Sequence, residues 1–492
     1  MSRRIFRAAA IGAAFITAVA LGGCDLGPDY KRPDTATPGE WREGDRDESV
    51  AWPSPAWWQE FGSAELNEMM TTAQQANADL GAAIARVKQA DAQLRIAGAA
   101  LLPSVQANAS PSNQRIVFPT INGPIPYTAY TVGISASYEI DFWGKNAAAR
   151  DAAKAASFAS RYDQQVVALT VVSGVATTYF QALGLQDRLQ VARDNLANAE
   201  SVLKLVREQG RVGTTTDLNI AQQETVVAGL RAAIPPLQQQ FSQALDALAI
   251  LLNRSPNDMR LAAQSLVPLP VPVVAPGLPS DLLERRPDVR EAEAQLIAAN
   301  ANIKVARAAF FPSITLTASG GFESFALSNF LSPASAIYTV AAALAQPIFE
   351  GGRLSGQLDY SKARYEELLQ NYRKAVISAF SNVEDALAAT RRTAEQQESQ
   401  QAAVAKARRA YEIAQLQYGV GSTDLLTVLN TENALFSAND LLAQIRIARM
   451  QALVSLFNAL GGGWQDSASQ GVAMATSPPS SIESGGRQNR PR

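Results

Sequence analysis

The segment TVGISASYEIDFWG, residues 131–144, alternates polar and apolar side chains before it ends in a tryptophan and a glycine. Alternate side chains of a β-strand point to opposite faces, so this pattern predicts a strand with one apolar and one polar face. In a soluble sandwich the polar face would meet bulk water. In a transmembrane barrel the apolar face meets lipid and the polar face lines a pore.

A shorter alternating segment, residues 104–110, precedes this strand and completes a predicted strand pair. The residues between them are expected to form a loop, because prolines occupy positions 111, 119, 124 and 126. Strands of about ten residues have the length that a bilayer requires. A second, less regular pair is predicted later in the chain. Its apolar faces consist of Ile314, Leu316 and Ala318 on one strand and Tyr338, Val340, Ala342 and Leu344 on the other.

Four motifs recur in the same order at nearly constant spacing, which predicts an internal duplication. They are LLPSV (101–105) and FFPSI (310–314), FWGK (142–145) and FEGGR (349–353), VGTT (212–215) and VGST (420–423), and residues 247–253 and 452–458. A proline-rich linker, residues 255–279, separates repeat 1 (63–254) from repeat 2 (280–464). Each repeat is expected to contain a helix, a strand pair, a long helix and a further helix.

A proline-free helical stretch follows each predicted strand pair, over about Gly144–Gly210 and about Arg353–Tyr418. A continuous helix of about 65 residues would be roughly 100 Å long, far beyond the helices of ordinary globular domains. The first helix of repeat 1 is predicted over roughly Ala64–Ala99, before Pro103. A soluble coiled-coil rod or adhesin would explain the long helices but not two amphipathic strand pairs.

The N-terminus has the pattern of a secretory signal, predicted over residues 1–23. Three arginines precede an apolar run, residues 8–21, that is too short for a membrane span of about 20 residues. Leu21-Gly22-Gly23-Cys24 is similar to a bacterial lipobox, which implies that Cys24, the only cysteine, carries a covalent lipid. The alternative is an uncleaved N-terminal membrane anchor. If Cys24 carries the lipid, residues 24–62 form a lipid-anchored N-terminal arm.

Composition excludes several kinds of function. Histidine is absent and there is one cysteine, which removes histidine-based triads and His- or Cys-rich metal sites. The net charge of −2 gives no basic footprint for nucleic acid. An envelope enzyme would need a convergent polar site, and none is found, so neither catalysis nor a cofactor other than the lipid is expected. Residues 465–492 are rich in Ser, Gly and Pro and are predicted to be disordered.

Four strands cannot close a membrane barrel, because single-chain barrels begin at about eight strands and open edges are not tolerated in lipid. The chain is therefore expected to oligomerise. Two copies would give a filled interior, whereas three copies leave room for water, which favours a homotrimer. Trp143 and Phe349 lie at the predicted strand-to-helix junctions, where an aromatic belt would meet the membrane interface.

Several longer motifs resemble one known family. They are LPSDLLERRPD (278–288), AAFFPS (308–313), GPDY (27–30), the tryptophan pair at 57–58 with Phe61-Gly62, and LGGGW (460–464). With these motifs the chain, from Cys24 to Trp464, resembles the outer-membrane factors of bacterial tripartite efflux systems, in the NodT-type lipoprotein branch.

The resemblance implies an α+β membrane protein. A trimeric β-barrel with four strands per protomer would continue into a long α-helical periplasmic barrel with a mixed equatorial domain. It also implies a passive duct in the outer membrane that works with a periplasmic adaptor and an inner-membrane transporter of the resistance-nodulation-division class, which selects the cargo. The exit duct of a type I protein secretion system shares this fold and is the alternative. Asp25 resembles an inner-membrane retention signal, but an outer-membrane location is expected because the strands must close.

Members of this family close at the periplasmic tip, where paired helices turn. The matching turns contain Gly213 and Gly421, and glycine suits a left-handed backbone there, as it also does at any helix C-cap. Alignment on Tyr418 and Gly421 places Leu426 at the position of a hydrophobic gate ring.

The same alignment places neutral residues at both acidic positions of the family, Asn430 at the commoner one and Thr427 at the other. This departure argues against a cation-binding tip. Asp424 is nearby and is expected either to cap the helix or to contribute to the gate. Tyr418, at the turn itself, is a further gate candidate. The alternative for Leu426 and Asn430 is simple packing between helices.

Overall fold

The computed structural model describes residues 27–35, 38–42, 53–117, 123–274, 279–462 and 464. The predicted signal (1–23), Cys24, Asp25 and the tail (465–492) lie outside these residues. The elements of the first half are the short helix η1 (Trp57–Phe61), α2 (Ala64–Ala76), α3 (Ala78–Ala99), β1 (Ser104–Val117), β2 (Pro124–Ile140), α4 (Lys145–Arg211) and α5 (Asp217–Leu251). After the short helix η2 (Pro256–Asp258) come α6 (Pro279–Arg285), α7 (Pro287–Ala308), β3 (Ser313–Ser324), η3 (Leu327–Asn329), η4 (Pro333–Ser335), β4 (Ala336–Ala345), α8 (Arg353–Gly419) and α9 (Leu425–Ala459).

The two long helices agree with the sequence prediction. Helices α4 and α8 have 67 residues each and begin and end within about a residue of the predicted bounds. The chain divides into two compact units, one of residues 1–36, 81–165 and 288–377 and one of residues 37–80, 166–287 and 378–492. Each unit therefore combines residues from both halves of the sequence.

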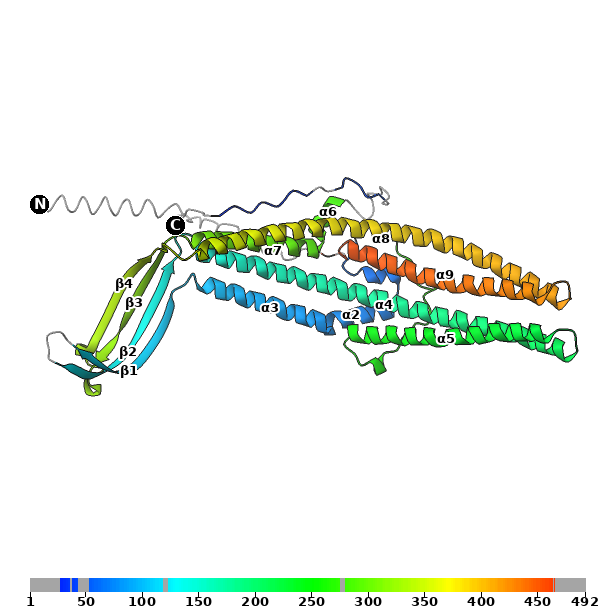
Figure 1. Ribbon diagram of the computed structural model, residues 1–492, viewed down its shortest axis with the longest axis horizontal. Helices are drawn as coiled ribbons and strands as arrows, with labels where there is room; N and C mark the ends of the chain where they lie inside the picture. The colour runs from blue at the N-terminus through cyan, green and yellow to red at the C-terminus, as the bar shows by residue number, and fades with distance from the viewer. Residues whose placement is uncertain are drawn as a thin grey trace, which may run out of the picture. The chain divides into compact units, whose positions relative to one another are not determined.

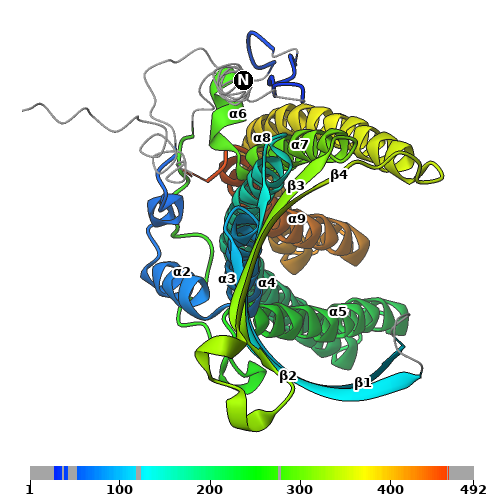
Figure 2. The same ribbon diagram turned by 90° about the vertical axis from the view of Figure 1, so that its left-hand side faces the viewer.

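The first unit contains an antiparallel sheet in the order β1-β2-β3-β4, which Figures 1 and 2 show as one curved layer. Strand β2 pairs with β3, so the hairpins of the two repeats join into one sheet. At this junction Gly133 lies opposite Gly321, and a Cβ atom on Gly321 would lie only 2.1 Å from the Val132 carbonyl oxygen. Glycine there permits a close approach of the two backbones that no side chain would allow.

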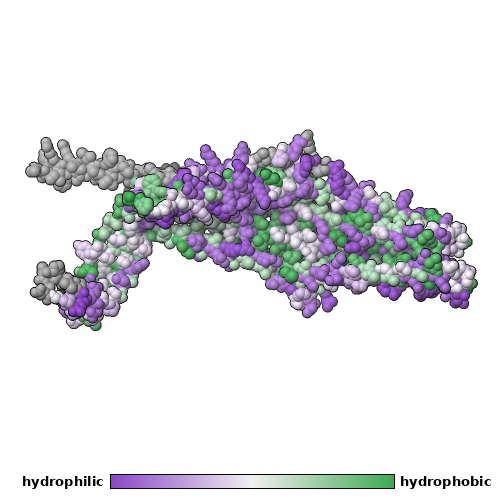
Figure 3. Space-filling view, in the orientation of Figure 1, coloured by the Kyte–Doolittle hydropathy of each residue, from purple (hydrophilic) through white to green (hydrophobic). Residues whose placement is uncertain are grey.

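Both edges of this sheet, β1 and β4, lack a partner strand among the residues of the single chain that the structure describes. All ten residues of β4 are exposed, including the large apolar side chains of Tyr338, Val340 and Leu344. The visible face of the sheet carries mainly neutral and weakly hydrophobic residues, in contrast to the hydrophilic surface along α7 and α8 (Figure 3). A sheet with exposed edges and exposed apolar side chains is incomplete as a soluble structure.

The loop predicted around the prolines of the first hairpin is wrong, because Pro111, Pro124 and Pro126 lie within strands. Proline cannot donate to a strand ladder and is tolerated where one side of the strand is unpaired. Pro111 is on the edge strand β1. Pro124 and Pro126 precede Tyr130, where the pairing of β2 with β3 begins.

The single first helix predicted over Ala64–Ala99 is also wrong, because the chain breaks into α2 and α3 at Asn77. The Asn77 side chain accepts a hydrogen bond from the Leu80 amide at 3.0 Å and donates to the Leu251 carbonyl at 2.8 Å. Asparagine competes with the helical backbone in this way, so it ends one helix and caps the next.

The second unit has an aromatic core around Trp57 and Phe61, both fully buried. The Trp57 ring stacks on Phe457 of α9, with 4.7 Å between ring centroids. The C-terminal glycines lie against this core, and a Cβ atom on Gly461 would lie 2.2 Å from the Arg285 carbonyl oxygen. The neighbouring Arg286 donates to the Ala459 carbonyl at 3.0 Å. The LPSDLLERRPD and LGGGW motifs therefore meet in space.

Helix α4 contains a segment that is long and apolar enough to cross a bilayer, the one such helix in the described part of the chain. Half of that segment is buried inside the structure, as in the core helix of a soluble domain. We therefore attribute its hydrophobicity to helix packing.

Candidate functional site

The turns between α4 and α5 and between α8 and α9 have the same backbone structure. Gly213 and Gly421 both have φ of +76°, which confirms the left-handed conformation predicted for them. In the first turn the Thr214 amide donates to the Gln209 carbonyl at 2.8 Å, and the equivalent bond of the second turn is also 2.8 Å long. These bonds satisfy the last carbonyls of each long helix.

Asp424 caps the start of α9. Its carboxylate accepts hydrogen bonds from the Thr427 amide at 2.8 Å and from the Thr427 hydroxyl at 2.6 Å. The hydrogen bonds from Thr427 lower the pKa of Asp424. The capping role is therefore confirmed, and an additional role in the gate stays a prediction.

Leu426 and Asn430 lie one turn apart on the exposed face of α9. The Leu426 residue is 54% exposed, whereas its neighbours Leu425 and Val428 are buried in the core of the tip. Within the single chain, neither Leu426 nor Asn430 packs between helices. Their side chains are thus available to a pore or to a neighbouring protomer, and the gate role stays a prediction.

Tyr418 links the two helical hairpins. Its hydroxyl donates to the side-chain oxygen of Gln209 on α4 at 2.6 Å, and burial raises its pKa. Residues of both turns, including Thr215 and Asp424, line a shallow groove of about 500 Å³ beside this bond. Tyr418 is therefore a contact between the hairpins, a role that the sequence alignment did not predict.

Glu432, which is fully buried in α9, was not among the residues predicted from the sequence. Neither carboxylate oxygen makes a hydrogen bond of normal geometry to any residue that the structure describes. Burial raises its pKa to about 7, an effect that neighbouring Gln223 partly offsets. The sequence did contain a signal for the burial of Glu432. This residue occupies a position in the apolar stripe of α9 that also contains Leu425, Val428, Leu429, Leu435 and Phe436.

The predicted interface aromatics differ in their surroundings. The Trp143 indole donates to the Pro312 carbonyl at 2.8 Å and packs on Phe311, so it ties the start of α4 to the segment before β3. Phe349 is 88% exposed. Contact of either ring with a membrane stays a prediction, and Cys24 lies outside the described residues.

A protein-family model described as "Outer membrane efflux protein" matches residues 69–254 and 278–462. This chain belongs to the outer membrane efflux protein family. Among its relatives is the pyoverdine export outer membrane protein OpmQ of Pseudomonas aeruginosa, 42% identical over 461 residues, or 92% of this chain and 96% of OpmQ. The cation efflux system protein CusC of Escherichia coli is 32% identical over 92% of this chain and 98% of CusC.

Solved structures of the outer membrane efflux protein family have the same fold. The outer-membrane channel OprN matches with a TM-score of 0.85 at 27% identity, over 90% of this chain and all of OprN. The crystal structure of CusC matches with a TM-score of 0.81 at 31% identity, over 89% of this chain and all of CusC. The predicted fold class is confirmed.

The protein is an outer-membrane exit duct for efflux, extending into the periplasm, as the sequence predicted. The relatives are efflux proteins, so the alternative of a type I secretion duct is not supported. The family is one of channels and not of enzymes.

Proposed function

We propose that this duct works as a homotrimer, in which β1 of each protomer pairs with β4 of the next to close one barrel. The unpaired edges of the four-stranded sheet carry the proposal, because lipid does not tolerate open strand edges. Three sheets give a barrel wide enough for a water-filled passage.

Cysteine cross-linking between the edge strands tests this arrangement. Within one chain β2 and β3 separate β1 from β4 by roughly 14 Å, too far for a disulfide, so any cross-link joins two chains. In a Cys24→Ser background, Asn108→Cys is combined in turn with Thr339→Cys, Ala341→Cys or Ala343→Cys. A ladder ending at three chains is expected for at least one pair, with Asn108→Cys alone as the control. A functional protein that stays monomeric would overturn the trimer.

The proposed partners are a periplasmic adaptor and an inner-membrane transporter of the resistance-nodulation-division class. Two exposed valines, Val212 and Val420, occupy equivalent positions in the two tip turns and offer an apolar contact for the adaptor. Val212→Asp and Val420→Asp should each weaken capture of the adaptor, whereas Val273→Asp, at an exposed valine of the linker, should not. Equal capture by all three variants would argue against docking at the turns.

The duct is proposed to be passive, with the cargo chosen by its pump. Relatives of comparable similarity are described as exporters of unlike compounds: pyoverdine for OpmQ, toluene for TtgC of Pseudomonas putida and cations for CusC. Ducts of one family therefore serve unlike cargoes, and exchange of the pump should change the exported compound while exchange of the duct should not.

The proposed gate is a ring of three Leu426 side chains at the periplasmic tip, which would exclude water by dewetting. Exposure of Leu426 and Asn430 on one face of α9 supports it. Leu426→Ala should raise leak conductance in planar bilayers. Millimolar divalent cations should block the wild type weakly, and Asn430→Asp should strengthen the block. Unchanged conductance of a trimeric Leu426→Ala variant would place the gate elsewhere.

Covalent lipid at Cys24 is proposed to anchor the N-terminal arm in the outer membrane. The signal pattern and the lone cysteine support it. Replacement of Cys24 by serine should abolish labelling with a radioactive fatty acid, and persistent labelling would contradict the proposal. Membrane fractionation tests sorting at the same time, because co-migration with the inner membrane would mean that Asp25 acts as a retention signal.

A further inference from the structure

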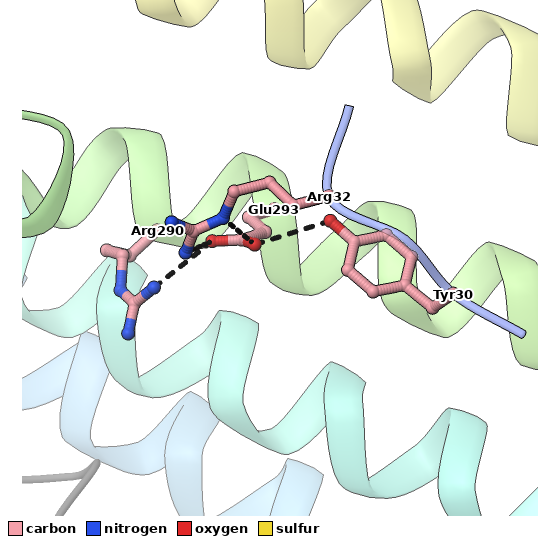
Figure 4. A network of polar contacts seen from close by, with 4 residues as sticks. All are labelled: Tyr30, Arg32, Arg290 and Glu293. Atoms are coloured by element: carbon pink, nitrogen blue, oxygen red, sulfur yellow. Dashed lines mark hydrogen bonds and ion pairs between the residues drawn. The ribbon is translucent and has the colours of Figure 1, made fainter. Parts of the chain in front are cut away.

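Residues 27–32, here called the N-terminal strap, bind to one face of α7 within the first unit. Arg32 donates to both carboxylate oxygens of Glu293, from Nε to Oε1 and from Nη2 to Oε2, at 2.7 Å each. The Tyr30 hydroxyl donates to Glu293 Oε1 at 3.3 Å. Arg290, one turn earlier on α7, reaches Glu293 Oε2 at 3.1 Å, so the strap and the helix both supply donors (Figure 4).

Two further contacts continue along α7 toward its C-terminal end. The Asn300 side chain donates to the Pro28 carbonyl at 2.9 Å, and the Lys304 ammonium lies 3.9 Å from the Asp29 carboxylate. Gly27 lies flat against the Lys304 side chain, since a Cβ atom on Gly27 would be 1.8 Å from Lys304 Cγ. Glu293, Asn300 and Lys304 follow one another at helical spacing and share one face.

The lengths of the two segments match. From Glu293 to Lys304 the helix rises roughly 16 Å, at about 1.5 Å per residue. From Arg32 back to Gly27 an extended chain spans roughly 17 Å, at about 3.4 Å per residue. The strap is therefore extended and antiparallel to α7, and each of its contacts falls opposite a residue on the same helical face.

Glu293 receives most of its hydrogen bonds from the strap. Its side chain is only 9% exposed, so its carboxylate needs donors from the protein. The contact from Arg290 supplies one of these, whereas Arg32 supplies a bidentate pair, the stronger and more directional contact. The pair therefore fixes both the position and the direction of the strap.

We propose that Glu293 and the face of α7 up to Lys304 form a receptor for the strap, which holds the lipid-bearing N-terminus beside the barrel. Two residues, Asp25 and Leu26, lie between Cys24 and Gly27, so the chain can carry the Cys24 lipid no farther than roughly 10 Å from Gly27. Helix α7 ends at Ala308, about 6 Å beyond Lys304, and β3 follows it. The acyl chains thus enter the lipid next to the strands that must pair.

The proposal rests on the lipidation proposed above and predicts that the clamp matters only when Cys24 carries lipid. Glu293→Gln and Arg32→Lys are made in the lipoprotein and in a Cys24→Ser form exported by an ordinary cleavable signal peptide. In the lipoprotein, each variant should lower the amount of outer-membrane trimer by about threefold or more. In the Cys24→Ser form, the same substitutions should have little effect.

Trypsin cleavage after Lys31 reports the docking itself. In purified trimer Glu293→Gln should speed this cleavage severalfold, because the strap is released. Arg42→Ala is the matched control, because Arg42 lies on the same arm and pairs with Glu384 of α8, but the Arg42 side chain is 81% exposed. It should change neither cleavage nor trimer yield.

Three results would overturn the proposal. Unchanged cleavage in Glu293→Gln would mean that no clamp exists. An equal loss of trimer with and without Cys24 would mean that Glu293 serves folding alone. Absence of fatty-acid label on the wild type would refute the lipidation, and with it the positioning of the anchor, while the cleavage result would still report the contact.

Discussion

Two buried glutamates show how differently this protein treats a carboxylate. Glu293 receives hydrogen bonds from Arg32, Arg290 and Tyr30, although it is almost fully buried. Glu432 is fully buried among apolar side chains and has no hydrogen bond of normal geometry within the described structure. A buried charge is costly unless it is paired, so Glu293 holds parts of the chain together, whereas Glu432 weakens the packing around it when ionised.

Replacement of each glutamate by leucine should give opposite results, and the largest effect belongs to Glu293. Glu293→Leu leaves the partly exposed Arg32 and Arg290 without their carboxylate and should destabilise by about 2–4 kcal/mol. Glu432→Leu removes a carboxylate without partners and should be neutral or stabilising by about 1–3 kcal/mol. Thermal denaturation of the detergent-solubilised protein at pH 8 measures both. Equal destabilisation by the two substitutions would remove the distinction.

The dependence of stability on pH separates the roles further. The folded state binds the Glu432 proton more tightly than the unfolded chain does, because burial raises its pKa to about 7. Protonated Glu432 therefore makes its full contribution to stability below about pH 4, near the pKa of this carboxyl in the unfolded chain. That contribution is lost as the pH rises through about 7, its pKa in the folded protein. Glu432→Gln should raise the melting temperature at pH 8 by a few degrees and raise it much less at pH 5. A gain of equal size at both pH values would contradict this.

Substitution of Gln223 should have a smaller effect on the pH dependence of stability. Gln223 is the polar neighbour that partly offsets the raised pKa of Glu432, and its amide also donates to the Ala199 carbonyl at 2.9 Å. Gln223→Met should therefore move the midpoint of the pH-dependent stability upward by less than about one unit. The same substitution in a Glu432→Gln background should show no such shift, and a shift there would mean that another group titrates.

The smallest expected effect is at Tyr30. Its bond to Glu293 is 3.3 Å long, and the bidentate Arg32 remains when the hydroxyl is removed. Tyr30→Phe should cost at most about 1 kcal/mol, the ordinary contribution of one such hydrogen bond. A loss as large as that of Glu293→Leu would mean that Tyr30, and not Arg32, is the main partner.

The regular parts of the fold were predictable from the sequence because periodicity and proline placement determine them locally. The long helices α4 and α8 and the four strands follow from such patterns. The break at Asn77 was missed because its side chain bonds to Leu251, a residue that is distant in sequence. The prolines in strands were missed because only the sheet order reveals which strand edges are unpaired.

The site was predictable only in part, for a similar reason. The left-handed turns at Gly213 and Gly421 follow from residue type, and the exposed face of Leu426 follows from helical periodicity. The contact of Arg32 with Glu293 joins residues 261 positions apart and leaves no local signal. Glu432 did leave one, as the single charged residue in an apolar stripe of α9.

The open edges of the sheet also have a genetic consequence. If each protomer completes the barrel of its neighbours, a protomer with a blocked β4 edge spoils every assembly that it enters. In a cell that makes equal amounts of normal and edge-blocked chains, random mixing leaves roughly one trimer in eight free of the defect. A mutation at this edge would therefore act dominantly, whereas a chain that fails to fold at all would be recessive.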